Sequence, residues 1–162
     1  MKTSISTRTA WTNPIHFIAF GFGSGTIPFA PGTFGTLMAI PFYLLIRDFH
    51  LVLYSSVLII ATLIGVWVCN VTEKQLGTHD YKGIVWDEVC GYWLTMLAAP
   101  HAWQWVVIGF FLFRLFDIWK PWPICWIDKY VQGGFGVMFD DILAGIYSLI
   151  VLQILVLMTG KI

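Results

Sequence analysis

LVLYSSVLIIATLIGVWVC, residues 51–69, runs for 19 residues without a charged side chain. A helix needs roughly 20 apolar residues to cross a lipid bilayer, with about 17 as the lower limit. The stretch therefore predicts a transmembrane helix. A second stretch, ILAGIYSLIVLQILVLM at residues 142–158, meets the same requirement nearly as well.

Three further apolar segments are found at residues 34–46, 89–100 and 103–119. The middle one is short enough to be tilted or only partly inserted. Gly/Pro-rich stretches, which break helices, separate the segments. We expect an all-α, polytopic membrane protein with about five membrane-embedded helices and Gly/Pro-rich cytoplasmic loops. It would form one domain over residues 1–162, with a polar tail at 1–12. A soluble helical core is the alternative for any single segment, but five together argue against it.

The composition supports this fold class. Hydrophobic residues make up 58% of the chain and charged residues only 11%, whereas about 25% are charged in ordinary soluble domains. Nine Trp and 13 Phe suit the aromatic belts found where a membrane meets water. The formal net charge is zero, which argues against a nucleic-acid partner.

Charge placement predicts an orientation. If the segment before residue 34 is cytoplasmic, the five spans place seven of the nine Lys and Arg on the cytoplasmic side. This agrees with the excess of Lys and Arg in cytoplasmic loops of membrane proteins. The same threading places eight of the nine Asp and Glu there. We therefore expect the functional site at the cytoplasmic surface of the membrane.

Five carboxylates lie at, or just inside, the ends of apolar segments: Asp87, Glu88, Asp117, Asp140 and Asp141. A charged side chain costs about 2.5–3.5 kcal/mol at the centre of a membrane helix, so clustered acids favour a polar cavity or an ion. Mg²⁺ prefers carboxylate oxygens, and the two adjacent pairs could hold one or two such ions. Asp117 would be a further ligand or an orienting acid. The alternative is helix capping, because acids favour the first turn of a helix.

Arg114, Asp117 and Lys120 are spaced three apart and so share roughly one helical face. A guanidinium can bind phosphate through two hydrogen bonds, and Lys binds it as a point charge. Arg114 and Lys120 are therefore candidate phosphate ligands. The alternatives are a local Arg–Asp ion pair and a lysine that extends to the membrane interface.

The loop GFGSGTIPFAPGTFGT, residues 21–36, offers free backbone N–H groups before a helix. Such loops can bind an anion, so Gly23, Ser24 and Gly25 are candidate phosphate contacts and Thr33 is a further possibility. The alternative is an interfacial turn in which the hydroxyls only cap a helix.

His79 and Asp80 lie in a loop on the same expected face. His79 could act as a general acid toward a leaving alkoxide, although a solvated loop histidine is the simpler interpretation. Asp128 is close in sequence to the candidate phosphate ligands, and the sequence leaves its role open.

Motifs for covalent phosphatase mechanisms are absent from the sequence. It has no Cys-x5-Arg loop, no Asp-x-Asp nucleophile pair, no Lys-x6-Arg-Pro with Ser-Gly-His, and no Gly-x-Ser-x-Gly elbow. Metal-assisted attack by water needs none of these nucleophiles. For that chemistry the catalytic candidates are Asp87, Glu88, Asp117 and Asp141, and the metal-binding candidates are Asp87, Glu88, Asp140 and Asp141.

Three long strings together resemble the bacterial phosphatidylglycerophosphatase A family. They are NPIHFIAFGFGSGTIPFAPGTFGT, THDYKGIVWDEVCGYW and FRLFDIWKPWPICWIDKYVQGGFGVMFDDILAG, in order from residue 13 to 145. The resemblance implies a compact all-helical, Mg²⁺-dependent phosphatase of the bacterial inner membrane. Its phospholipid substrate would be phosphatidylglycerophosphate, converted to phosphatidylglycerol and phosphate. The roles of individual acids rest on the chemistry above rather than on the resemblance.

Two other functions remain open. A membrane phosphatidyl-group transferase could use the same metal chemistry, but its Asp-Gly-x2-Ala-Arg signature is absent. A small ion carrier or channel subunit would scatter its acids through the membrane depth, whereas these acids gather at one end. The sequence does not fix the number of metal ions, the general base, the oligomeric state or the acyl-chain and head-group selectivity.

Overall fold

The structure, a computed structural model, describes residues 11–77 and 81–160. These residues form seven α-helices and one short 3-10 helix, with no strand among them. In chain order the elements are α2 (Pro14–Ala19), η1 (Ser24–Thr26), α3 (Pro31–Ile46), α4 (Leu51–Leu76), α5 (Trp86–Thr95), α6 (Trp103–Trp119), α7 (Ile124–Tyr130) and α8 (Gly133–Thr159). The expected all-α class is confirmed.

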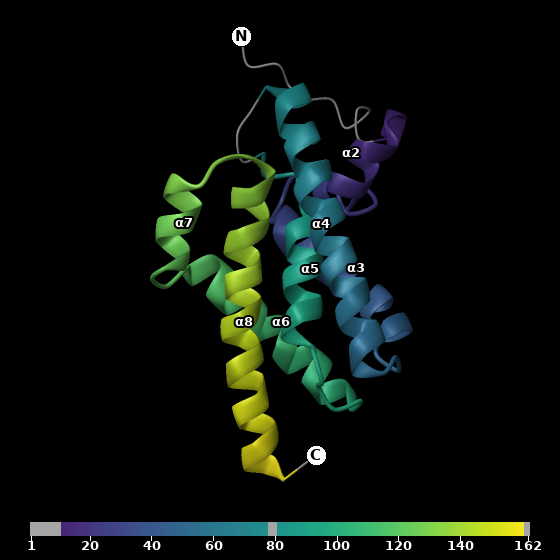
Figure 1. The fold of residues 1–162 in the computed structure, drawn as a ribbon, viewed down its shortest axis with the longest axis vertical. Coiled ribbons are helices and arrows are strands. Elements are labelled where there is room, and N and C mark those ends of the chain that lie inside the picture. Colours follow the sequence, from purple (N-terminus) through teal and green to yellow (C-terminus); the bar gives the residue numbers. More distant parts are fainter. Residues whose placement is uncertain (1–10, 78–80, 161–162) are drawn as a thin grey trace.

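Helix α5 forms the centre of the bundle. Eight of its ten residues are buried, and it packs against α3, α4, α6 and α8 (Figure 1). Helix α7 lies to the side of the bundle, against α8. A short central helix surrounded by longer ones places its first turn inside the protein.

Aromatic side chains fix α5 against its neighbours. The indole Nε1 of Trp86 donates to the Ala61 carbonyl in α4 at 3.0 Å. The indole of Trp93 donates to the Ala39 carbonyl in α3 at 3.1 Å, and the Tyr92 hydroxyl donates to a carbonyl of α6. Buried donors left without a partner would cost about 1–3 kcal/mol each. These bonds therefore fix the position of α5, and with it the direction of the acids in its first turn.

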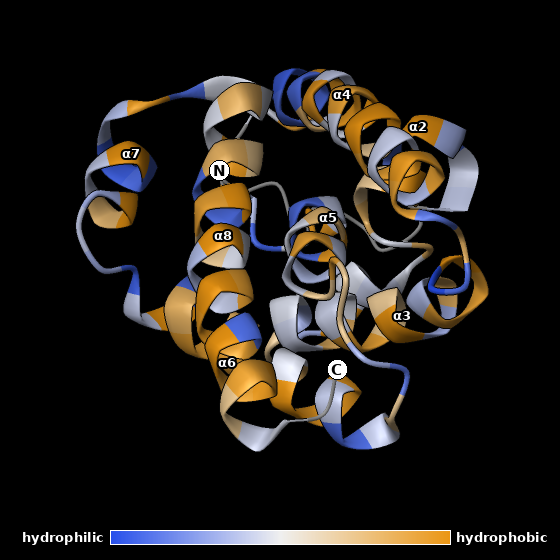
Figure 2. Cartoon of the chain, turned by 60° about the horizontal axis from the view of Figure 1, so that its bottom comes forward, coloured by the Kyte–Doolittle hydropathy of each residue, from blue (hydrophilic) through white to orange (hydrophobic). Residues whose placement is uncertain are grey.

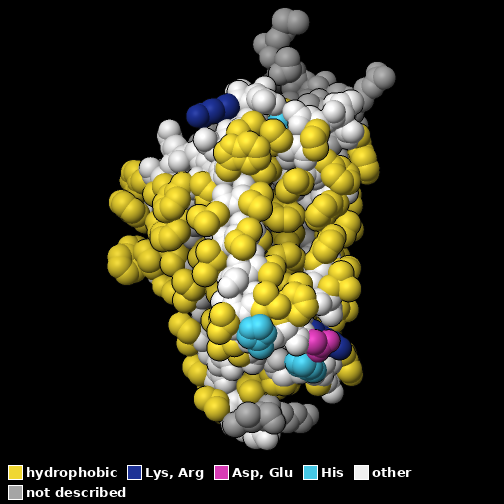
Figure 3. All heavy atoms as spheres, turned by 45° about the vertical axis from the view of Figure 1, so that its right-hand side comes forward, with side chains coloured by type: hydrophobic (Ala, Val, Ile, Leu, Met, Phe, Trp, Pro, Cys, Tyr) yellow, Lys and Arg dark blue, Asp and Glu magenta, His cyan; other side chains and the backbone are white. Residues whose placement is uncertain are grey.

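Two helices, α4 with 26 residues and α8 with 27, are long and apolar enough to cross a membrane. Helix α3 is apolar but has only 16 residues, and the ten residues of α5 span about 15 Å. The described residues thus contain two such helices rather than the five expected from the sequence. Hydrophobic residues extend along α4 and α8 (Figure 2). On the face shown in Figure 3 they cover the middle, while charged and His side chains lie toward the two ends.

The last helix starts earlier than its apolar run suggests. α8 begins at Gly133, nine residues before the expected start at 142. Asp140 and Asp141 therefore lie about two turns inside the helix, so the capping interpretation is wrong for this pair. Asp87 and Glu88 do lie in the first turn of α5, as that interpretation requires.

Helices α5 and α8 meet through glycines. A Cβ added at Gly145 would lie 2.6 Å from the carbonyl oxygen of Gly91, and one added at Gly91 would lie 2.8 Å from the carbonyl oxygen of Asp141. Real Cβ atoms essentially never come within 3.0 Å of such atoms. The two main chains can therefore approach this closely only because neither residue carries a side chain.

Candidate active site

A cavity of about 260 Å³ opens between the start of α3, the start of α5, the end of α6 and the N-terminal half of α8. Its charged lining comes from four separate stretches of sequence. The charged residues are Lys82, Asp87, Glu88, Arg114, Asp117, Lys120, Asp128, Asp140 and Asp141. All five carboxylates of the expected cluster, together with Arg114, Lys120 and Asp128, thus face one cavity.

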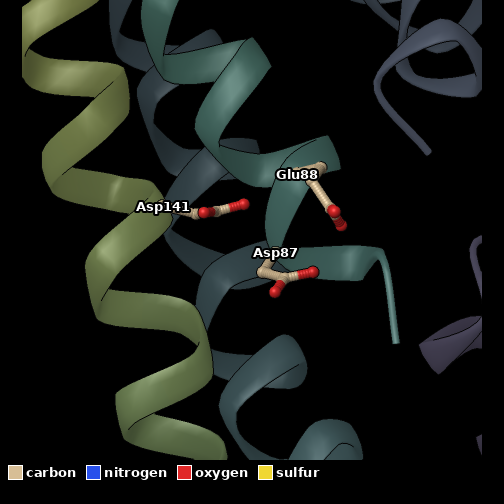
Figure 4. A group of neighbouring side chains, drawn as sticks. All are labelled: Asp87, Glu88 and Asp141. Atoms are coloured by element: carbon tan, nitrogen blue, oxygen red, sulfur yellow. The ribbon is translucent and has the colours of Figure 1, made fainter. Parts of the chain in front are cut away.

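Asp87, Glu88 and Asp141 form the tightest group in this cavity. Each offers one carboxylate oxygen, and these three oxygens lie within 4.8 Å of one another. Figure 4 shows Asp141 extending from α8 toward the two acids of α5. Each of the three, and Asp140 as well, has one buried carboxylate oxygen without a hydrogen-bond partner among the described residues. Unpartnered buried oxygens are costly, and a set made only of carboxylates suits a hard divalent cation such as Mg²⁺.

The electrostatics of the α5 acids are consistent with this interpretation. Burial, together with the charge of Asp141, raises the pKa of Glu88 to about 8. Burial, followed by the charge of Glu88, holds the pKa of Asp87 well above its usual range. A nearby cation would favour the ionised forms and lower both pKa values. Without a cation, the protein therefore disfavours the ionised forms of these two acids.

Arg114 lies at the edge of the acid group. Its Nη1 forms an ion pair with Asp117 Oδ2 and lies 3.9 Å from Glu88 Oε1. The local Arg–Asp pair considered from the sequence is therefore present. The side chain is only 15% exposed and also lines the cavity, so the pairing and the cavity position coexist. Asp117 therefore holds the guanidinium at the edge of the cavity.

Lys120 connects three parts of the fold. Its Nζ donates to Asp128 Oδ1 in α7 at 2.5 Å and to Asp140 Oδ2 in α8 at 2.6 Å. Lys120 ends α6 with φ of +43°, a left-handed conformation that is unfavourable for residues other than glycine. Its ammonium group is thus held by two carboxylates that line the cavity.

The lining residues that the sequence analysis did not single out include Gly32 and Lys82. A Cβ at Gly32 would lie 2.2 Å from Glu88 Oε1 and 3.0 Å from Arg114 Nη1. The start of α3 therefore touches the charged group directly, and the positive end of its helix dipole faces the acids. Pro31 at the first helical position was a signal for this helix start.

The other part of the glycine loop lies elsewhere. Gly23, Ser24 and Gly25 are not among the residues that line the cavity. The Ser24 hydroxyl donates to the Gly21 carbonyl at 2.8 Å, and a Cβ at Gly25 would lie 2.0 Å from the Gly83 carbonyl oxygen. These residues build a tight loop that packs beside α5. The part of the loop that reaches the cavity is its end, at residues 30–32.

Three weaker candidates remain. Thr33 lies in the first turn of α3 next to Gly32 but does not line the cavity. His79 and Asp80 lie outside the described residues.

The cavity lies within a region that defines a known family. A family model described as Phosphatidylglycerophosphatase A matches residues 17–156, which include every residue lining the cavity. The chain belongs to the phosphatidylglycerophosphatase A family. The resemblance stated from the sequence is thereby confirmed.

Curated relatives agree with this family. A Phosphatidylglycerophosphatase A from Escherichia coli K12 is 49% identical over 148 residues, covering 91% of this chain and 86% of the relative. The protein of the same name from Haemophilus influenzae is 43% identical over 141 residues, covering 86% of each chain. A relative from Bacteroides thetaiotaomicron is 42% identical over 145 residues, covering 85% of this chain and 90% of its own, and carries the provisional name phosphatidylinositol-3-phosphatase. No solved structure matches the chain.

Proposed function

We propose that this protein is a membrane phosphatase that hydrolyses phosphatidylglycerophosphate to phosphatidylglycerol and phosphate. The observation that carries the proposal is the charged cavity, in which one oxygen from each of three carboxylates of α5 and α8 lies within 4.8 Å of the others, in a lining that includes an arginine and lysines. Membership of the phosphatidylglycerophosphatase A family supports the choice of substrate. Water would attack the terminal phosphorus, the bond from phosphorus to the glycerol oxygen would break, and the leaving alkoxide would take up a proton.

The proposed location is the cytoplasmic face of the bacterial inner membrane. Only 28% of the apolar window of α4 and of α8 is buried inside the protein, which does not fit two core helices of a soluble domain. Leu63 in α4 and Ile150 in α8 are 65% and 52% exposed. Such apolar surface is stable in contact with lipid, so α4 and α8 would cross the bilayer and the shorter helices would be embedded beside them.

Asp87, Glu88 and Asp141 would hold Mg²⁺, and Asp140 has a free oxygen that could join them. When bound there, Mg²⁺ would activate water and offset the charge that builds on the phosphoryl oxygens. One of the buried carboxylates would accept the proton of the attacking water.

Arg114, Lys120 and the start of α3 would receive the phosphate. Arg114 would offer guanidinium N–H groups held in place by Asp117, and Lys120 would offer a charge fixed by Asp128 and Asp140. These two groups would donate hydrogen bonds to the phosphate, while a bound Mg²⁺ would offset the excess of acids in the cavity lining.

A phosphate-release assay on purified protein in detergent tests the proposal. We expect release of inorganic phosphate from phosphatidylglycerophosphate, loss of activity with EDTA, and recovery with added Mg²⁺. CMP formation would instead indicate the phosphatidyl-group transferase. Ion flux through proteoliposomes without phosphate release would indicate the carrier or channel.

Replacing Arg114 with Lys keeps a positive charge but removes the forked donor geometry. We expect kcat/KM for phosphatidylglycerophosphate to fall by about 100-fold, in the range typical for loss of one positioned donor to a transition state. The measurement is steady-state phosphate release, and Arg47→Lys, at the other end of the bundle, is the matched control. A change of less than twofold in Arg114→Lys would remove Arg114 from the phosphate site.

A second lipid phosphomonoester deserves the same assay, because one relative carries a name that specifies phosphatidylinositol 3-phosphate. The charged cavity would bind the phosphate group and would therefore accept either head group on charge alone. We expect phosphatidylglycerophosphate to be cleaved with the higher kcat/KM, since two other relatives are named for it. Faster cleavage of the inositol lipid would reassign the substrate and leave the site unchanged.

A further inference from the structure

Helix α6 carries a second, apolar groove next to the charged cavity. The groove has a volume of about 700 Å³. It is lined by Phe111, Arg114, Leu115, Ile118 and Trp119. Its four apolar side chains are 54–72% exposed, and from Phe111 to Trp119 it follows the helix for about 12 Å.

The groove and the cavity occupy adjoining faces of the same helix. Successive residues on a helix point about 100° apart, so the buried Phe113 faces the core, Asp117 faces the cavity and Leu115 faces the groove. Arg114 and Ile118 lie between the last two faces and line both spaces. A molecule with a charged end in the cavity could therefore extend an apolar part along the groove without leaving the protein surface.

Aromatic packing fixes one end of the groove. The Trp119 ring is stacked on Phe116 at 6.4 Å between centroids, and Phe116 contacts the Tyr147 ring of α8 edge-on at 5.7 Å. Trp119 is 68% exposed, yet its orientation is set by this stack. The groove therefore has a fixed aromatic wall directly before Lys120, whose ammonium group lines the cavity.

We propose that this groove binds an acyl chain of the phospholipid substrate while the terminal phosphate lies in the charged cavity. The inference rests on the proposed function and adds the position of the lipid tail. Arg114, at the junction, would contact the phosphate side of the substrate, and Leu115 and Phe111 would contact the chain. The substrate would thus enter from the bilayer past α6.

Another large cavity does not offer this continuity. It lies between the α3–α4 turn and the α5–α6 turn, with a volume of about 540 Å³, and it shares no residue with the charged cavity. Its lining includes Arg47 and His101, which lie near Asp48 and far along the bundle from the acids. The α6 groove, by contrast, shares Arg114 and Ile118 with the charged cavity.

Kinetics on two substrates provide the first test. Leu115→Ser removes apolar surface from the groove without touching the cavity, and Leu63→Ser makes the same change on the exposed face of α4. We expect Leu115→Ser to raise KM about tenfold for long-chain phosphatidylglycerophosphate, a typical effect of losing an apolar contact to a substrate. We expect less than a twofold change with a dibutyryl analogue, and no change in either assay for Leu63→Ser.

Photocrosslinking provides a second test that does not depend on turnover. The probe is a phosphonate analogue of phosphatidylglycerophosphate with a diazirine in the acyl chain, and labelled peptides are identified by mass spectrometry. We expect labels within residues 111–119 that are displaced by unlabelled phosphatidylglycerophosphate but not by phosphatidylethanolamine. Displacement by both lipids would mean that bulk lipid fills the groove and would overturn the proposal.

The remaining outcomes separate the two proposals. Equal KM changes in Leu115→Ser and Leu63→Ser, or competable labels confined to other helices, would overturn the groove and leave the phosphatase function intact. If the unmodified protein releases phosphate from neither substrate, the proposed function fails. Labelling of α6 displaced only by the substrate lipid would still support the groove in that case.

Discussion

Asp141→Asn should reduce phosphate release by at least about 100-fold, since even residues that only support metal ligands cost 10–100-fold when changed. Asp141 is the one member of the tight carboxylate group contributed by α8. Asn keeps the size of the side chain and removes its negative charge, so the helix packing should survive while the cation site loses a ligand. Glu88→Gln and Asp87→Asn should have similar effects. Phosphate release at saturating Mg²⁺ is the measurement.

Asp48→Asn is the matched control, because Asp48 is an exposed acid paired with His101 at the other end of the bundle. It should retain normal turnover. Size-exclusion profiles and thermal unfolding in detergent would establish that the inactive variants remain folded. Near-normal rates in all three acid variants would show that this cluster is not the catalytic metal site.

Gly32→Ala should also lower kcat by about 100-fold, because a displacement of about 1 Å at a reacting group can have that effect. The added Cβ would lie 2.2 Å from Glu88 Oε1 and 3.0 Å from Arg114 Nη1, so both side chains must move. Alanine favours a helix over glycine by about 1 kcal/mol, so helix α3 itself should not be weakened. The measurement is kcat at saturating substrate and Mg²⁺.

Leu37→Ala, on an exposed position of the same helix, serves as the control and should keep full activity. Thermal unfolding separates a local displacement from loss of the fold. If Gly32→Ala were fully active and stable, the start of α3 could not be in contact with the working conformation of Glu88 and Arg114.

Part of this fold could be predicted from the sequence, because apolar runs without charges form helices of recognisable length. Helix α6 coincides with the expected segment 103–119, and α4 starts at the expected residue 51. The ends were less predictable, because α4 continues through polar residues to Leu76 and α8 starts in a glycine-rich stretch at Gly133. Hydropathy indicates which residues contact lipid or the protein core. It does not indicate where the backbone hydrogen bonds of a helix begin and end.

The acids of the candidate site could be identified from the cost of placing charges beside apolar segments, but Lys82 could not. That argument located Asp87, Glu88 and Asp141 without knowing how the helices pack. It missed Gly32, because the effect of an absent side chain depends on neighbours that are distant in sequence. The glycine loop suggested phosphate contacts at residues 23–25, but these residues do not line the cavity, and Gly25 packs against Gly83 and Val85 instead. The burial of α5 in the centre of the bundle could not be predicted either, because a ten-residue helix is too short to show a clear hydrophobic periodicity.

The glycine contact between α5 and α8 has a consequence for how the enzyme would respond to its lipid surroundings. Membrane helices tilt when bilayer thickness changes, and such tilting would normally shift ligands that are contributed by different helices. Gly91 and Gly145 lie within about one turn of the three carboxylates and bring main chain against main chain. The carboxylate oxygens of α5 and α8 would therefore keep their spacing in thin and thick bilayers alike. The turnover rate would then depend on the substrate concentration rather than on bilayer thickness.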